Sequence, residues 1–156
     1  YGDSLAIDVV DLSNAGLVLN QKDRKSRVIS HIKTKIVELS EKYKVIVVNT
    51  IPEVGLNVPN YLAKCKNRDV VNCKNSTSFQ VYEKRNSLMS KALAEISNEN
   101  IKVFNPSKVL CDQKLGRCNI AINGRPIYRD DDHLTSTFGS SLLSEGIVPI
   151  VLENLP

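Results

Sequence analysis

The residues best suited to chemistry stand near the carboxyl end of the chain, in the run Tyr-Arg-Asp-Asp-Asp-His-Leu-Thr from Tyr128 to Thr135. Asp130 precedes His133, one of only 2 histidines in the chain, by three residues. A carboxylate at this spacing can hold an imidazole in one tautomer, and the imidazole can then take a proton from a serine hydroxyl. The side chains of Asp131 and Asp132 are expected to point elsewhere, away from the His133 ring. The pattern predicts the base and the orienting acid of a nucleophilic serine site.

A nucleophile is available at the other end of the chain, in Gly2-Asp3-Ser4. Glycine admits a sharp turn that leaves the hydroxyl of Ser4 exposed. Each motif alone also has an ordinary explanation, the first as a chance match and the second as a solvated acidic turn beside a helix. Their occurrence together favours a triad of Ser4, His133 and Asp130.

These motifs resemble the first and last blocks of the SGNH hydrolase superfamily. The similarity is closest to the extracytoplasmic SGNH domain fused to the membrane-embedded acyltransferase-3 domain of bacterial polysaccharide O-acetyltransferases. That domain typically ends in a Tyr-x-Asp-x-x-His-Leu-Ser run with a glycine a few residues on, after a short cysteine-bounded loop. Here Tyr128 to Thr135, Gly139, and Cys111 with Cys118 match those features. The similarity covers most of the chain from Ile7 onward and is most specific at the C-terminal end.

The resemblance implies a flavodoxin-like fold, a three-layer α/β/α sandwich with a mainly parallel sheet. It also implies O-acetyl transfer through an acyl-enzyme on Ser4, with His133 as base, Asp130 orienting the ring and the Ser4 backbone N–H binding the oxyanion. In the superfamily an asparagine assists the oxyanion. Asn14 is the nearest candidate, but the local sequence lacks the usual Gly-x-Asn-Asp, so a turn-forming asparagine is the alternative. No metal and no other cofactor is required.

The implied partners are a membrane acyltransferase-3 domain in the same polypeptide, as acetyl donor, and an envelope polysaccharide such as lipopolysaccharide O-antigen, as acceptor. Two other functions stay open. A secreted carbohydrate or lipid esterase would use the same triad, because water and a sugar hydroxyl attack an acyl-enzyme alike. A non-catalytic glycan-binding or assembly domain could keep the fold without the reaction.

Composition indicates one globular domain over residues 1–156, with 42% hydrophobic residues. The net charge of +4 arises from 21 basic and 17 acidic residues spread along the chain. Since no basic block with interleaved aromatics occurs, a nucleic-acid partner is not expected. No run reaches the ~18 apolar residues of a membrane span.

The start of the chain suggests a fragment of a longer protein. The buried strand that should deliver Ser4 is absent before it, and Ile7 follows Ser4 where the family has a sizeable segment. We therefore expect residues to have been omitted after Ser4, and an N-terminal membrane acyltransferase domain in the full protein. The domain would then be periplasmic or extracytoplasmic, tethered to the bacterial inner membrane.

The 4 cysteines fall into two local pairs, Cys65 with Cys73 and Cys111 with Cys118. Three connectivities are formally possible. The spacings and the lack of nearby histidines disfavour zinc, so disulfides are favoured over metal ligands or free thiols. Two disulfides would fit an oxidising compartment.

Periodicity predicts the elements that position these residues. His31 is expected on the surface of the first helix, and Met89 as core filler in the second. The first half of the chain is expected to form a strand at 7–12, a helix at about 24–43, a buried strand at 45–48 and a long loop at 53–78. The second half is expected to form a helix at about 79–98, a strand at 101–104, a hairpin turning at Asn123-Gly124, and a helix after Thr135 that reaches Gly146. This order of elements itself argues for an α/β sandwich.

Overall fold

The computed structural model describes residues 21–66 and 77–154. Its centre is a parallel pair of strands, β1 (Val45–Val48) and β3 (Ile101–Phe104), paired from Val45 opposite Ile101 to Val48 opposite Phe104. Both strands have the predicted bounds. Short apolar runs of this kind suit parallel strands covered on both faces.

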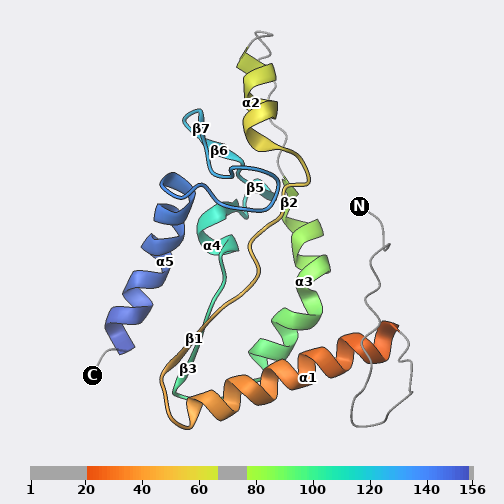
Figure 1. Cartoon of the computed structure of the whole chain (residues 1–156), viewed down its shortest axis with the longest axis vertical. Coiled ribbons are helices and arrows are strands. Elements are labelled where there is room, and N and C mark those ends of the chain that lie inside the picture. The colour runs from red at the N-terminus through yellow and green to blue at the C-terminus, as the bar shows by residue number, and fades with distance from the viewer. Residues whose placement is uncertain (1–20, 67–76, 155–156) are drawn as a thin grey trace.

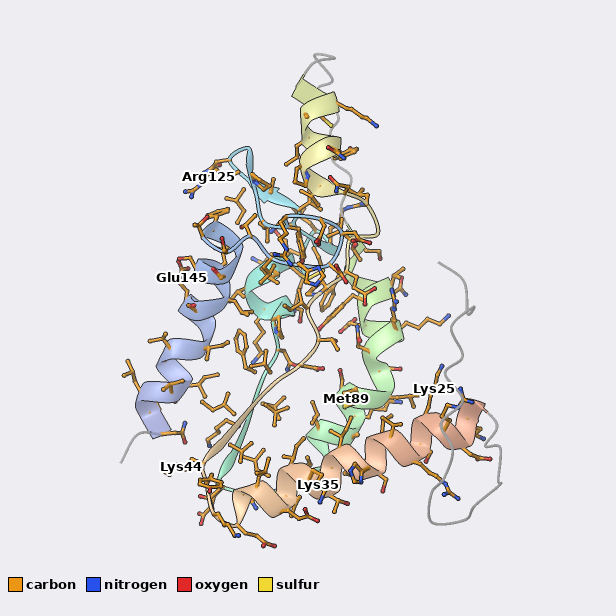
Figure 2. The ribbon with its side chains drawn as sticks, viewed as in Figure 1. Lys25, Lys35, Lys44, Met89, Arg125 and Glu145 are labelled. Atoms are coloured by element: carbon orange, nitrogen blue, oxygen red, sulfur yellow. A yellow bond between two sulfur atoms is a disulfide. The ribbon has the colours of Figure 1, made fainter. Side chains whose placement is uncertain are left out.

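Two helices cover one face of this pair. α1 (Gln21–Ser40) crosses one end of it, and α3 (Phe79–Ala94) runs alongside (Figure 1). Ile36, Leu93 and Ile101 form the buried centre of this layer, which we call the sheet cluster. Met89 packs against it where α3 meets α1 (Figure 2), as predicted, and His31 is exposed.

The last helix, α5 (Phe138–Asn154), packs on the other face of β3. A Cβ atom added at Gly146 would lie 2.6 Å from the ring of Phe104, so this glycine permits a close approach of helix and strand. The helix was predicted to stop at Gly146. That boundary is wrong, because α5 continues through Pro149 to Asn154.

The predicted long loop also contains a helix, α2 (Val58–Lys66). Its start has a capping signal that periodicity did not reveal, since the side chain of Asn57 accepts a hydrogen bond from the N–H of Asn60 at 3.0 Å. Pro59 suits a first helical turn, which needs no N–H there. A further short helix, α4 (Ser107–Leu110), follows β3.

The remaining strands are short and antiparallel. β2 (Thr77–Ser78), β5 (Arg117–Cys118) and β4 (Cys111–Asp112) form one sheet in that order. β6 (Ala121–Ile122) and β7 (Arg125–Pro126) form the predicted hairpin. Asn123 and Gly124 at its tip have φ angles of 50° and 75°, the left-handed pair that this dipeptide favours.

The mixture of helices and sheets confirms the α/β class. In residues 21–66 and 77–154, β1 and β3 are the parallel strands, so the mainly parallel sheet and the three-layer sandwich stay predictions. The strand expected at 7–12 lies outside the described residues. Over the described part of the chain, no helix has the length and apolar character needed to cross a membrane.

The cysteine prediction is confirmed for one pair. Cys111 and Cys118 form a disulfide and lie opposite each other in the β4–β5 ladder. Cys65 is disulfide-bonded, and Cys73, its expected partner, lies outside the described residues.

Candidate active site

The Asp130–His133 turn stands on a second hydrophobic core, which we call the turn cluster. Val58, Leu110, Ile120, Ile127 and Tyr128 make up its buried centre, and four of them have no exposed surface. They come from the start of α2, the end of α4 and the segments on either side of the β6–β7 hairpin. Elements far apart in the sequence therefore share one support beneath the turn.

The turn closes on itself through backbone pairing. Tyr128 and Leu134 form an antiparallel bridge, and the Arg129 N–H donates to the His133 carbonyl oxygen at 2.9 Å. Inside this closure, Asp130 Oδ1 accepts hydrogen bonds from the backbone N–H of His133 at 2.7 Å and of Asp132 at 3.1 Å. The aspartate thus stabilises the backbone that carries the histidine.

The loop after β1 fastens the turn from outside. The N–H groups of Val54 and Val58 donate to the carbonyl oxygens of Asp131 and Asp130, at 2.8 Å and 3.2 Å. The buried hydroxyl of Tyr128 donates to the Pro52 carbonyl oxygen at 2.8 Å. Burial, with a smaller contribution from Tyr82, raises the pKa of the Tyr128 hydroxyl strongly, so Tyr128 acts here as a neutral donor.

The segment after the turn is fixed at Thr135, which lies just before the last helix. Its N–H donates to the Ile127 carbonyl oxygen at 2.8 Å, and its Oγ1 accepts from the Gly139 N–H at 2.7 Å, so Thr135 caps the first turn of α5. A Cβ atom at Gly139 would overlap the Ile127 carbonyl oxygen. Only glycine fits this contact, which explains the residue on packing grounds.

His133 presents its two ring nitrogens differently. Nδ1 lies 3.0 Å from Asp130 Oδ2 and 3.2 Å from Oδ1, with hydrogen-bond geometry. Nε2 is the ring nitrogen that this pair leaves for a serine. A carboxylate at Nδ1 favours the tautomer with a basic Nε2. The use of the pair in catalysis stays a prediction.

Asp132 does not point elsewhere, as the sequence had suggested. Its Oδ1 lies 2.8 Å from His133 Nδ1, as close as either oxygen of Asp130. The sequence spacing did not predict this contact. The closed backbone of the turn brings the side chain of Asp132 back against the ring of the adjacent His133.

The carboxyl of Asp130 is held in its charged form. Its pKa lies below the ordinary value, chiefly because the His133 backbone N–H hydrogen-bonds to the charged form, with smaller contributions from Asp132 N–H and the His133 ring and with desolvation opposing. Arg129 Nε also lies 3.6 Å from Asp130 Oδ2. A permanently charged Asp130 at neutral pH suits an orienting role.

The donor atoms of Asp130, Asp132 and His133 all lie within 4.8 Å of one another, the set in the described residues that could hold a metal ion. One imidazole and two carboxylates suit zinc or a similar ion. The three groups already contact each other, however, and exposed carboxylates commonly gather without an ion. Nothing in this arrangement favours metal chemistry over the serine reaction.

A cavity of about 560 Å³ lies at the carboxyl ends of the parallel strands, where ligand sites in such sheets occur. Asn49 follows β1 and Asn105 follows β3, and both line this cavity. The Asn49 side chain donates to Asn105 Oδ1 at 2.9 Å and to Ser90 Oγ at 3.1 Å. These bonds join the ends of both strands to α3, so Asn49 has a structural role at this cavity.

Two predicted site residues, Ser4 and Asn14, lie outside the described residues, so their geometry relative to His133 stays a prediction. The supporting residues Tyr128, Pro52 and Val58 were not identified from the sequence as parts of the site. Tyr128 was noted only as part of the motif, and the hydrogen bond of its hydroxyl follows from its burial, which only the structure shows.

Comparison with known proteins gives one result. The family model described as "SGNH domain (fused to AT3 domains)" matches residues 4–149. No curated protein and no solved structure matches the chain. The matched range includes both Ser4 and the Asp130–His133 turn.

Proposed function

Because the chain belongs to the family of SGNH domains fused to acyltransferase-3 domains, we propose that it is the O-acetyl-transferring domain of a bacterial envelope polysaccharide O-acetyltransferase. The family supports an acyltransferase-type role and a membrane acyltransferase-3 domain in the same polypeptide. It likewise supports a membrane-tethered protein with this domain outside the cytoplasm. Periplasmic location and a lipopolysaccharide O-antigen acceptor belong to the proposal.

The observation that carries the proposal is the His133 turn, with a charged Asp130 at Nδ1 and with backbone hydrogen bonds both inside the turn and from Val54 and Val58. A base must be held in one orientation if its Nε2 is to meet a serine hydroxyl repeatedly. We propose Ser4 as that serine. In the expected sandwich, Ser4 would meet His133 across the carboxyl ends of the parallel strands.

The reaction would proceed in two balanced steps. His133 Nε2 takes the Ser4 hydroxyl proton as Oγ attacks the acetyl carbonyl carbon, and the imidazolium then returns this proton to the donor's leaving group. In the second step, Nε2 takes the proton of a sugar hydroxyl, whose oxygen attacks the acetyl-serine. The proton passes to Ser4 Oγ as it leaves. The N–H of Ser4, with help from Asn14, would stabilise each tetrahedral oxyanion.

The test is acetylation of surface polysaccharide in cells that make the full-length protein. Ser4→Ala and His133→Ala should each abolish the acetyl groups without altering polysaccharide chain length. His31→Ala is the matched control, because it removes the other, exposed histidine and should leave acetylation unchanged. Normal acetylation in the Ser4→Ala and His133→Ala strains, with the protein present at normal level, would exclude the proposal.

The esterase alternative uses the same residues. The rate of ester hydrolysis distinguishes it from acetyl transfer. A transferase must protect its acyl-serine from water until the acceptor arrives, so the isolated chain should hydrolyse an activated acetyl ester slowly. Rapid hydrolysis by the chain, together with unchanged polysaccharide acetylation in the Ser4→Ala strain, would select the esterase.

A further inference from the structure

The His133 turn holds two carboxylates at one ring nitrogen, where a triad needs only one. Asp132 Oδ1 lies 2.8 Å from Nδ1, and Asp130 Oδ2 lies 3.0 Å from it. We propose that Asp132 is a second positioning residue, which shares with Asp130 the task of keeping the proton on Nδ1 and the imidazolium stabilised. The rate consequences of this inference rest on the proposed function, whereas its consequences for the ring do not.

The two carboxylates differ in the contacts that they make besides the histidine ring. Asp130 Oδ1 accepts two backbone N–H groups, and Asp130 Oδ2 lies near Arg129 Nε at 3.6 Å. Asp130 is therefore partly engaged in building the turn, and part of its charge is balanced by Arg129. For Asp132, the histidine ring is the contact that the structure gives its carboxylate.

The geometry also divides the task. The directed hydrogen bonds to Nδ1 are those of Asp130, while Asp132 approaches the same nitrogen as a close charge. A nearby negative charge favours Nδ1–H over a bare Nδ1 lone pair and stabilises the positive ring that forms during transfer. Because the side chains of Asp132 and His133 are 50% and 59% exposed, solvent limits the strength of this contact.

Asp131 is a matched control within the same turn. It carries the same charge and adjoins Asp132, and its backbone carbonyl accepts from the Val54 N–H. In the described part of the chain its side chain makes no hydrogen bond or ion pair. Asp131→Asn therefore removes an equal charge from the turn without removing a contact to the ring.

The first experiment reads the ring directly by ¹⁵N NMR of the full chain at alkaline pH, where imidazoles are neutral. His31→Ala in every variant leaves His133 as the single histidine. We expect Nδ1–H in the parent, in Asp131→Asn, and still largely in Asp130→Asn, because Asp132 remains. The double variant Asp130→Asn/Asp132→Asn should shift to Nε2–H. If the double variant and Asp130→Asn have the same tautomer populations, Asp132 has no positioning role.

The second experiment measures hydrolysis of an activated acetyl ester by the same variants. Asp132→Asn should lower kcat about fivefold, a loss of about 1 kcal/mol, with little change in KM. The double variant should fall at least about tenfold below Asp130→Asn, as expected where each carboxylate compensates for the other. Equal kcat for Asp132→Asn and Asp131→Asn overturns the proposal. If Ser4→Ala retains full activity, the proposed function fails, and the NMR result still decides the role of Asp132.

Discussion

The turn cluster and the sheet cluster differ in a way that their secondary structure would not suggest. The turn cluster rests on loops and two-residue strands, yet Val58, Leu110, Ile127 and Tyr128 are fully buried. The sheet cluster rests on long helices and a parallel strand pair, yet its buried residues Ile36, Leu93 and Ile101 stay 9%, 3% and 8% exposed. Regular elements therefore do not mark the best-packed part of this molecule.

The comparison indicates where the chain is least tolerant of change. At the turn cluster a Cβ atom added to Gly139 would meet the backbone of Ile127, whereas beside β3 a Cβ atom added to Gly146 would meet the side-chain ring of Phe104. A catalytic histidine needs the first kind of surroundings. The predictions below test this difference, beginning with the largest effect.

Two glycines of α5 provide the sharpest comparison. Gly139→Ala should destabilise the chain by about 1–3 kcal/mol, because the new methyl group would overlap the Ile127 carbonyl oxygen, which is fixed by Thr135. Gly146→Ala meets only the Phe104 ring and the Val109 side chain and gains helix propensity, so its net change should stay within about 1 kcal/mol. Urea unfolding of both variants measures the difference. Equal losses would show that the backbone contact at Ile127 is no less tolerant than the side-chain contact at Phe104.

The Cys111–Cys118 disulfide should contribute the next largest effect. For a sequence separation of 7, the loss of chain entropy on closing the loop predicts about 2–3 kcal/mol. The double variant Cys111→Ala/Cys118→Ala should lower the free energy of unfolding by about this amount, since the β4–β5 ladder supports the end of α4 beside the turn cluster. Reductant should lower the free energy of unfolding of the parent by at least this amount. In the variant, this bond should contribute nothing to the effect of reductant.

The hydrogen bond of the Tyr128 hydroxyl should contribute less to the free energy of unfolding than the disulfide. It should contribute more than the similar hydrogen bond of the Tyr82 hydroxyl. Tyr128→Phe leaves the buried Pro52 carbonyl without its donor and should cost about 1–2 kcal/mol. Tyr82→Phe removes a similar bond, 2.9 Å to the Thr50 carbonyl oxygen, at a partly buried site and should cost less. Comparable losses from both variants would contradict the greater burial of the turn anchor.

The same tyrosine predicts an alkaline limit to stability. Burial raises the pKa of Tyr128 in the folded chain, while the unfolded chain keeps a value of about 10. The neutral hydroxyl therefore contributes its full stability below about pH 10, and this contribution is lost as the pH rises toward the folded pKa. Unfolding midpoints between pH 8 and pH 11 should fall in the parent more steeply than in Tyr128→Phe.

The sequence predicted the regular elements better than the supports of the site. β1 and β3 have apolar runs and the hairpin has Asn123-Gly124, so local patterns were enough for them. α2 was missed because its start depends on capping by Asn57, and α5 was cut short because Gly146 reads as a stop although it serves packing on Phe104. The contacts from Pro52, Val54 and Val58 to the turn span more than seventy residues, and no local pattern encodes them.

The smallest effect concerns the two backbone hydrogen bonds that Asp130 accepts. Asp130→Ala should destabilise the turn slightly more than Asp130→Asn, because the asparagine oxygen can still accept from the N–H groups of Asp132 and His133. The pKa of Asp130 is lowered in the folded chain, so its charged form stabilises the fold above the unfolded value of about 3.9. That contribution is lost as the pH falls through the folded pKa. Urea midpoints of the parent and Asp130→Asn should therefore differ at pH 7 and converge in acid. A difference that persists unchanged below the folded pKa would mean that the charge of Asp130 does not stabilise the turn.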